Sequence, residues 1–118
     1  MPPRDTVRAM DIAFRSKSLR DICESEEMLK KHFGNQVGES VKRRLADLRA
    51  AASINDVAVG NPRELATEIQ PTMSVDLPDD YRLIFRPNHL KTPLDSDRRV
   101  NWSAVTRIKV MSIEQPHD

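Results

Sequence analysis

Two arginines, Arg82 and Arg86, are the side chains in this sequence best suited to chemistry on a phosphate group. A guanidinium is planar, stays charged and donates in pairs to phosphate oxygens. Both lie in residues 81–86, where apolar and polar side chains alternate as in a strand with one buried face. A strand would place the two guanidinium groups on one face, about 13 Å apart. Such a pair suits an extended polyanion better than a small ligand.

Two further basic residues, Arg107 and Lys109, alternate with apolar residues in the segment 105–113. The alternation places Val105 and Met111 on the same face as these basic side chains. Periodicity does not fix the order of the strands, so it leaves open whether the basic residues meet. The cations that one open face could gather are Arg82, Arg86, Arg107 and Lys109.

The other reactive residue types do not form a recognisable site. Cys23 stands alone in a helical pattern, which is typical of a small packed residue rather than a nucleophile. His32 and His89 have no ligand spacing with each other or with Cys23, so we expect neither a metal nor another cofactor.

Composition and charge give few further constraints. The chain has 118 residues, 38% hydrophobic and 31% charged, which fits one domain. Residues 1–60 hold 11 Lys and Arg against 9 Asp and Glu, whereas residues 61–118 hold 8 against 9. A polyanion site in the second half must therefore come from local arrangement and not from bulk charge.

We expect a flexible extension over residues 1–9 and a single domain over residues 10–118, with Met10 as an alternative start. The sequence contains no apolar run of 18 residues and no signal peptide, and its single cysteine suits a reducing compartment. These features predict a cytoplasmic protein without a membrane segment.

The remaining helices and strands are predicted from the periodicity of apolar residues and from residues that end such elements. A strand is predicted over residues 11–15, and helices on either side of a break at Phe33-Gly34-Asn35. A short edge strand is predicted over residues 64–69, and a long polar loop over residues 87–103. The hairpin 73–86 turns at Pro78-Asp79-Asp80. The second helix has an apolar stripe, made of Val37, Val41, Leu45, Leu48 and Ala52.

This order predicts an α+β fold, with N-terminal helices packed on one face of a small antiparallel sheet and the other face open. The second helix also carries four basic residues, which are Lys42, Arg43, Arg44 and Arg49. They indicate either a solvated helix face or contact with an acidic partner or RNA. On the hairpin, an ion pair with Asp76 or Asp80 is the structural alternative to a phosphate contact for Arg82.

Three strings resemble the HigB branch of the RelE/ParE toxin superfamily. They are Met10-Asp-Ile-Ala-Phe14, the hairpin with Tyr81-Arg-Leu-Ile-Phe85, and the stretch from Trp102 to Val110 that reads Trp-Ser-Ala-Val-Thr-Arg-Ile-Lys-Val. The resemblance spans residues 10–118. It implies the same α+β fold and a toxin of a type II toxin-antitoxin system. Its implied activity is ribosome-dependent cleavage of mRNA, without a metal.

The resemblance also implies roles for individual residues. Arg82 matches the phosphate-binding arginine of the family, and His117 matches a terminal histidine. Arg63 stands where a histidine is expected, so the implied catalytic residues are Arg82, Arg63 and His117. Implied RNA and phosphate contacts are Arg86, Arg107 and Lys109.

The chain departs from the family where catalytic lysines are expected, because Ala66 and Gln70 occupy those positions. Two function classes follow. One is an endoribonuclease whose activity is weakened by the replaced segment, and the other is an inactive toxin-fold module that only binds an antitoxin. A gyrase poison of the ParE kind is a third alternative, which has less support because the resemblance is to the HigB branch.

The implied partners are a HigA-like helix-turn-helix antitoxin, the ribosome and mRNA. The antitoxin would cover the open face or lie along the helices. DNA would be reached only through the antitoxin.

Overall fold

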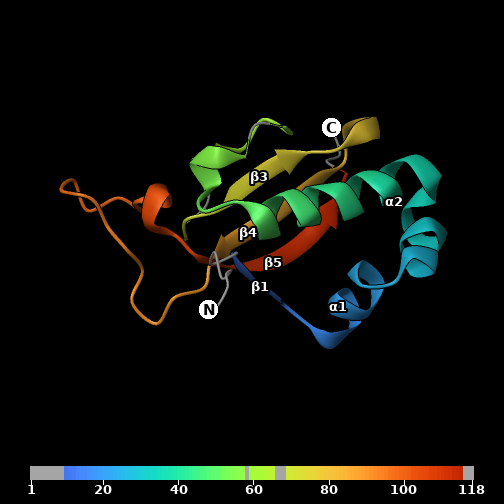
Figure 1. Ribbon diagram of the computed structural model, residues 1–118, viewed down its shortest axis with the longest axis horizontal. Helices are drawn as coiled ribbons and strands as arrows, with labels where there is room; N and C mark the ends of the chain where they lie inside the picture. The colour runs from blue at the N-terminus through green and yellow to red at the C-terminus, as the bar shows by residue number, and fades with distance from the viewer. Residues whose placement is uncertain (1–9, 58, 66–68, 116–118) are drawn as a thin grey trace, which may run out of the picture.

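A strand comes first, two helices follow, and the remaining strands close the chain, as the sequence predicts (Figure 1). The computed structural model describes residues 10–57, 59–65 and 69–115. The predicted extension 1–9 and His117 lie outside these described residues. The elements are β1 Asp11–Phe14, α1 Lys17–Cys23, α2 Glu26–Ala50, β2 Arg63–Glu64, β3 Met73–Asp76, β4 Arg82–Pro87 and β5 Arg107–Glu114, with short 3-10 turns η1 Ile54–Asp56, η2 Pro78–Asp80 and η3 Trp102–Ala104.

The five strands form one sheet in the order β1-β5-β4-β3-β2. Strands β2 to β5 pair antiparallel, as predicted. β1 is added in parallel beside β5, with Ile12 opposite Ile108, so the whole sheet is mixed. A parallel pair needs a long crossover connection. The helices and the hairpin between β1 and β5 provide it, and the α+β class is confirmed.

Serine caps start both helices. Ser16 Oγ accepts from the backbone N–H of Leu19, and Ser25 Oγ accepts from that of Met28, both at 3.1 Å. Each cap satisfies one of the free N–H groups at a helix start. Within α2, Gly34 has φ 85° and ψ 170°, which interrupts the helix at the predicted break.

The apolar stripe of α2 faces the sheet, and its members Val37, Val41, Leu45 and Leu48 are buried. Ala52 was predicted to continue this stripe, but it is exposed. The helix ends at Ala50, and Ala51 is extended, with φ −79° and ψ 141°. Helical periodicity therefore no longer applies at Ala52, and Ala51 is buried in its place.

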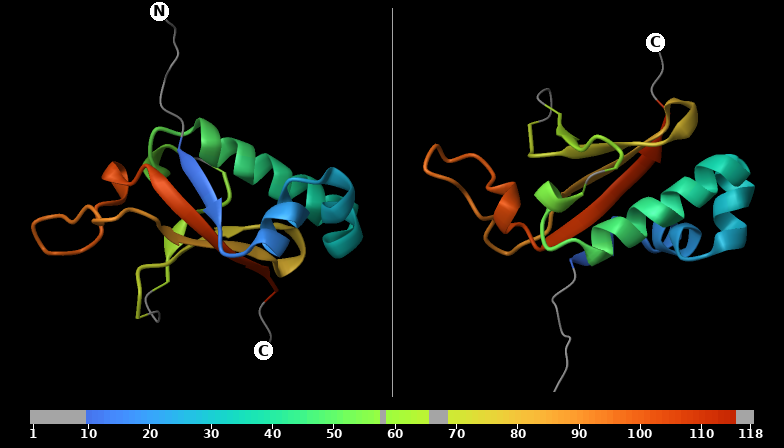
Figure 2. Two further views of the ribbon diagram at one scale, coloured as in Figure 1. Left: turned by 90° about the horizontal axis from the view of Figure 1, so that it is seen from below. Right: turned by 45° about the horizontal axis from the view of Figure 1, so that its top comes forward.

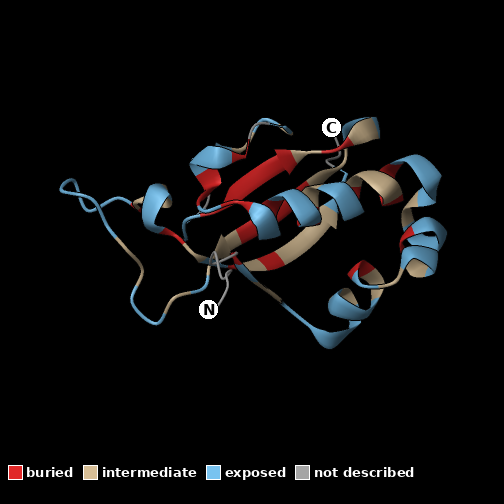
Figure 3. Ribbon diagram, in the orientation of Figure 1, coloured by how far each residue is buried: buried red, intermediate tan, exposed pale blue. Residues whose placement is uncertain are grey.

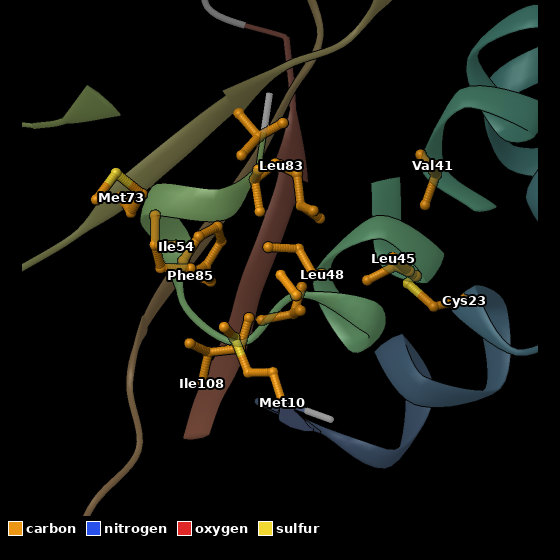
Figure 4. Packing of buried hydrophobic residues seen from close by; sticks show 14 of the residues in the cluster. Met10, Cys23, Val41, Leu45, Leu48, Ile54, Met73, Leu83, Phe85 and Ile108 are labelled. Atoms are coloured by element: carbon orange, nitrogen blue, oxygen red, sulfur yellow. The ribbon is translucent and has the colours of Figure 1, made fainter. Parts of the chain in front are cut away.

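The core lies between α2 and one face of the sheet (Figures 3 and 4). Figure 4 shows Leu48 of α2 among sheet residues Leu83, Phe85 and Ile108, and Leu45 beside Cys23. Further buried members are Met10, Cys23, Leu29, Ile54, Met73, Val75, Leu77, Val105 and Val110. Figure 2 shows α2 on one side of the sheet, so this helix does not cover the other side.

The predicted hairpin is present, with Val75 opposite Leu83 and Ser74 opposite Ile84. The strict alternation predicted for residues 105–113 is wrong at two points. Val105 is fully buried, because it precedes β5 and follows the turn η3. The register of β4 and β5 also shifts between Ile84 and Phe85, whose partners are Ser112 and Val110, so Met111 is the extra residue of a β-bulge.

The other predicted segments are partly structured. The edge strand expected over 64–69 appears only as β2, and residues 66–68 lie outside the described part. The loop 87–103 contains a bridge between Leu94 and Val100 and projects from the sheet (Figure 1). Among the described residues, no helix is both long enough and apolar enough to cross a membrane.

Candidate functional site on the open face of the sheet

The predicted cations of β4 lie on the face of the sheet away from α2. Leu83 and Phe85 are fully buried on the helix side, so alternation turns Arg82, Ile84 and Arg86 to the other side. The register then places Arg82 between its strand partners on β3 and β5, and Arg86 opposite Lys109. We call this face the open face.

Arg82 lies between two carboxylates at one end of the open face. Its cross-strand partners are Asp76 on β3 and Glu114 on β5. Arg82 Nη2 is 3.7 Å from Glu114 Oε1, which is a loose ion pair. The structural alternative considered for Arg82, an ion pair with Asp76 or Asp80, is therefore replaced by one with Glu114.

Arg63 joins the same end of the face from β2. It pairs with Ser74 in the register, so the two side chains share a face. Its Nη2 donates to Asp76 Oδ1 at 3.0 Å. Arg63 thus contacts the Asp76 carboxylate, and Arg82 lies opposite Asp76 in the register, which brings two of the three residues implied as catalytic to the same end of the face. His117, the third, lies outside the described residues.

Arg86 is held at the other end of the hairpin by polar side chains. Its Nε donates to Thr72 Oγ1 at 3.1 Å, and its Nη1 donates to Gln70 Oε1 at 3.0 Å. Thr72 Oγ1 in turn donates to the backbone oxygen of Gln70 at 2.8 Å. Gln70, at the position where the resemblance implies a lysine, therefore positions a cation instead of supplying one.

The remaining predicted cations come from β5. Arg107 lies opposite Asp11 of β1, and its Nε is 3.6 Å from Asp11 Oδ2. Lys109 lies between Ala13 of β1 and Arg86 of β4. Alternation along β5 puts Arg107 and Lys109 on the open face, because Ile108 is buried on the other side.

The open face therefore has an excess of positive charge. The cations are Arg63, Arg82, Arg86, Arg107 and Lys109, and the carboxylates are Asp11, Asp76 and Glu114. Among the described strand residues of this face, five cations against three carboxylates give a local charge of +2, although residues 61–118 as a whole are slightly acidic. Fixed guanidinium groups of this kind can bind phosphate oxygens and stabilise charge that develops on a phosphorane.

Few of the described side chains near Arg82 can accept a proton. Among the described residues of the open face, the groups near Arg82 that can accept a proton are the carboxylates of Asp76 and Glu114. His89 lies in the loop after β4, where its Nε2 accepts from the backbone N–H groups of Thr106 at 3.1 Å and Arg107 at 3.3 Å. That imidazole anchors the loop to β5, so it has a structural role.

The basic residues of α2 do not extend this face. Lys42 donates to Glu26 at 2.9 Å, and this hydrogen bond raises the pKa of Lys42 and lowers that of Glu26. Arg44 lies 3.0 Å from Asp47. Because α2 covers the opposite side of the sheet, these pairs are separate from the open face (Figure 2). Lys42 is 54% exposed and fits the interpretation of a solvated helix face, whereas the Arg44 side chain is only 16% exposed and does not.

Cys23 is packed, as predicted. It is buried, and this burial raises the pKa of its thiol to about 11, so the thiol stays protonated at neutral pH. The described residues contain no cluster of three or more His, Cys, Asp and Glu side chains that could hold a metal ion.

Sequence patterns missed two buried polar residues of the face, Ser74 and Thr72, which are 0% and 1% exposed. The alternation Met73-Ser-Val-Asp76 contains the signal for Ser74. It puts Ser74 and Asp76 on the side opposite Met73 and Val75. A serine in such a pattern is ordinarily a solvated residue, so its burial could not be anticipated.

The fold and the site define a small α+β domain that presents a cation-rich sheet face. Comparison of the chain with protein-family models, with curated proteins and with solved structures finds no match. The resemblance to the RelE/ParE superfamily therefore stays a prediction from the quoted residues.

Proposed function

We propose that the open face binds the backbone of single-stranded RNA, and that the protein is a HigB-like toxin acting on mRNA at the ribosome. One observation carries the proposal. The register of the sheet aligns Arg63, Arg82, Arg86, Arg107 and Lys109 on one face, away from the helices. Arrays of fixed cations that follow an extended surface suit a phosphate backbone.

The proposed reaction is cleavage by the RNA's own 2′-hydroxyl. Its oxygen attacks the adjacent phosphorus and its proton passes to a base. The bond from phosphorus to the 5′-oxygen of the next nucleotide breaks, and this oxygen takes a proton from water, which leaves a 2′,3′-cyclic phosphate and a 5′-hydroxyl. Arg82 and Arg63 would stabilise the charge on the phosphorane. His117 or one of the carboxylates beside Arg82 would accept the proton, and this limited set is consistent with weakened activity.

The second candidate is an inactive toxin-fold module that only binds an antitoxin. It is favoured by the groups around Arg82, which are carboxylates rather than the lysine or histidine expected from the resemblance. In both cases the proposed partner is a HigA-like helix-turn-helix protein, through which DNA would be reached. The proposed compartment is the cytoplasm, where the ribosome and mRNA are found.

Controlled expression with growth and translation as readouts tests the activity. We expect translation arrest and cleaved mRNA, both lost in Arg82→Ala. Arg43→Ala is the matched control, because it removes an exposed arginine from α2 on the other side of the sheet. Intact mRNA on stalled ribosomes would refute nuclease activity. Complex formation with a helix-turn-helix protein of about 100 residues, without growth arrest, would support the second candidate.

A further inference from the structure

Two buried polar atoms on the open face have no hydrogen-bond partner among the described residues. One is Ser74 Oγ, and the other is Arg82 Nε. Ser74 is 0% exposed, so its hydroxyl cannot be satisfied by simple contact with solvent. A buried polar group without a partner costs free energy, and such groups in folded proteins call for a physical explanation.

The two atoms belong to neighbouring positions. Ser74 lies opposite Ile84 on β4, and Arg82 is two residues before Ile84. Ser74 and Arg82 are therefore diagonal neighbours on one face, about 7–8 Å apart and somewhat closer between their Cβ atoms. An arginine side chain is long enough to span that distance, so both donors can reach one group placed between them.

Two other hydroxyl groups of the face, those of Thr72 and Ser112, have hydrogen-bond partners. Thr72 Oγ1 donates to Gln70 and accepts from Arg86. Ser112, which flanks Ile84 on the opposite side from Ser74, donates to Glu114 Oε2 at 2.7 Å. Among the described residues of this face, Ser74 Oγ and Arg82 Nε are therefore the buried side-chain atoms that lack a partner.

Arg63 lies next to Ser74 on the neighbouring strand β2. It lies opposite Ser74, and its guanidinium reaches Asp76, which is two residues further along β3. The Arg63 side chain therefore runs along β3 from the level of Ser74 to that of Asp76. Its ion pair with Asp76 is more than half exposed on the Arg63 side, at 55%, so it can open at little cost.

We propose that Ser74 and Arg82 form a subsite for one phosphoryl group, which Arg63 borders and closes through its ion pair with Asp76. A tetrahedral oxyanion presents several acceptor oxygens, so it can accept from the Ser74 hydroxyl and the Arg82 Nε–H together. The group would be a phosphodiester of RNA or free phosphate. Taking RNA as the source rests on the proposed function, whereas binding of phosphate does not.

The test compares thermal unfolding of the intact protein in inorganic phosphate and in potassium chloride of equal ionic strength. We expect phosphate to raise the unfolding midpoint of the wild type. Ser74→Ala should increase the apparent Kd for phosphate about tenfold, the effect of losing one hydrogen bond to a charged group. Ser112→Ala is the matched control, because it removes a satisfied hydroxyl from the other side of Ile84, and it should change the Kd less than about twofold.

A second readout separates a binding role from a structural one. Without phosphate, Ser74→Ala should unfold within about 2 °C of the wild type or higher, because its hydroxyl has no partner to lose. A clear loss of stability in chloride would show that the hydroxyl has a structural partner and would overturn the subsite. Equal phosphate affinity in wild type and Ser74→Ala would overturn it as well.

Binding of an uncleavable 2′-O-methyl oligouridine separates the two possible sources. RNA binding without any phosphate response would refute the subsite and leave the proposed function standing. A Ser74-dependent phosphate response without RNA binding would support a free-phosphate site and refute the proposed function. Ser74-dependent binding of both ligands would support both proposals.

Discussion

We predict that Asp76 weakens the proposed binding of RNA, because its carboxylate pairs with Arg63 and lies opposite Arg82 in the register. The substitution Asp76→Asn keeps the size and hydrogen-bonding ability of the side chain but removes its charge. The local charge of the open face then rises from +2, five cations less three carboxylates, to +3. We expect Asp76→Asn to bind single-stranded RNA more tightly than the wild type.

The magnitude follows from the spacing of the strands. A phosphate bound between Arg63 and Arg82 would lie about 5 Å from the Asp76 carboxylate, the cross-strand separation of side chains. At that distance two like charges in water repel by about 0.8 kcal/mol, which corresponds to roughly fourfold in Kd. The ion pair lost with Arg63 is exposed, so its removal should lower the free energy of unfolding by less than about 1 kcal/mol.

Fluorescence anisotropy with a labelled oligouridine at low salt measures the effect. Asp21→Asn is the matched control, because it makes the same change of charge at an exposed α1 residue paired with Lys17. An equal gain in both variants would show that bulk charge acts and not the open face. Weaker binding by Asp76→Asn would show that Arg63 must be held by Asp76 to contact RNA, and it would refute the repulsion argument.

Two further outcomes concern stability. Gly60→Ala should lower the free energy of unfolding by about 2–4 kcal/mol in a urea titration, because φ is +93° and a Cβ would lie 2.5 Å from Val75 Cγ1. Gly34→Ala, at φ +85° with no atom within 4 Å of the added Cβ, has only the backbone strain and should lower the free energy of unfolding less. An equal decrease in both variants would refute the steric argument. Burial raises the pKa of Cys23 from 9.0 to about 11, so the folded state holds the thiol proton more tightly than the unfolded state does. Relative to Cys23→Ala, the wild type should therefore lose roughly 1–2 kcal/mol of stability as pH rises from about 9 to about 11. Urea midpoints that change in parallel for the two proteins across that range would contradict this prediction.

Much of the fold could be predicted because it depends on local patterns. The alternation in residues 73–86 and the turn at Pro78 define the hairpin, and the break at Gly34 follows from its left-handed backbone. The stripe of α2 predicts its buried face up to the last helical turn. The prediction fails at Ala52, because the helix end depends on where the chain turns into η1 and not on spacing.

The arrangement of the open face could be predicted only in part. Alternation places Arg82 and Arg86 on one face, but it cannot show that Arg86 is held by Gln70 and Thr72. Nor can it show that Ser74 is buried, because burial depends on which side chains of neighbouring strands lie above a residue. Such contacts join residues far apart in the chain, and a single sequence has no pattern that records them.

The sequence by itself determined which side chains each strand turns to the same side, because successive residues of a strand alternate between the two faces. It did not determine which carboxylate meets Arg82. Strict alternation from Ile108 would turn Glu114 toward the helices, but the β-bulge at Met111 reverses the faces and places Glu114 opposite Arg82. The tertiary structure alone decided this contact, because the bulge arises from the pairing of β5 with β4 and not from β5 itself.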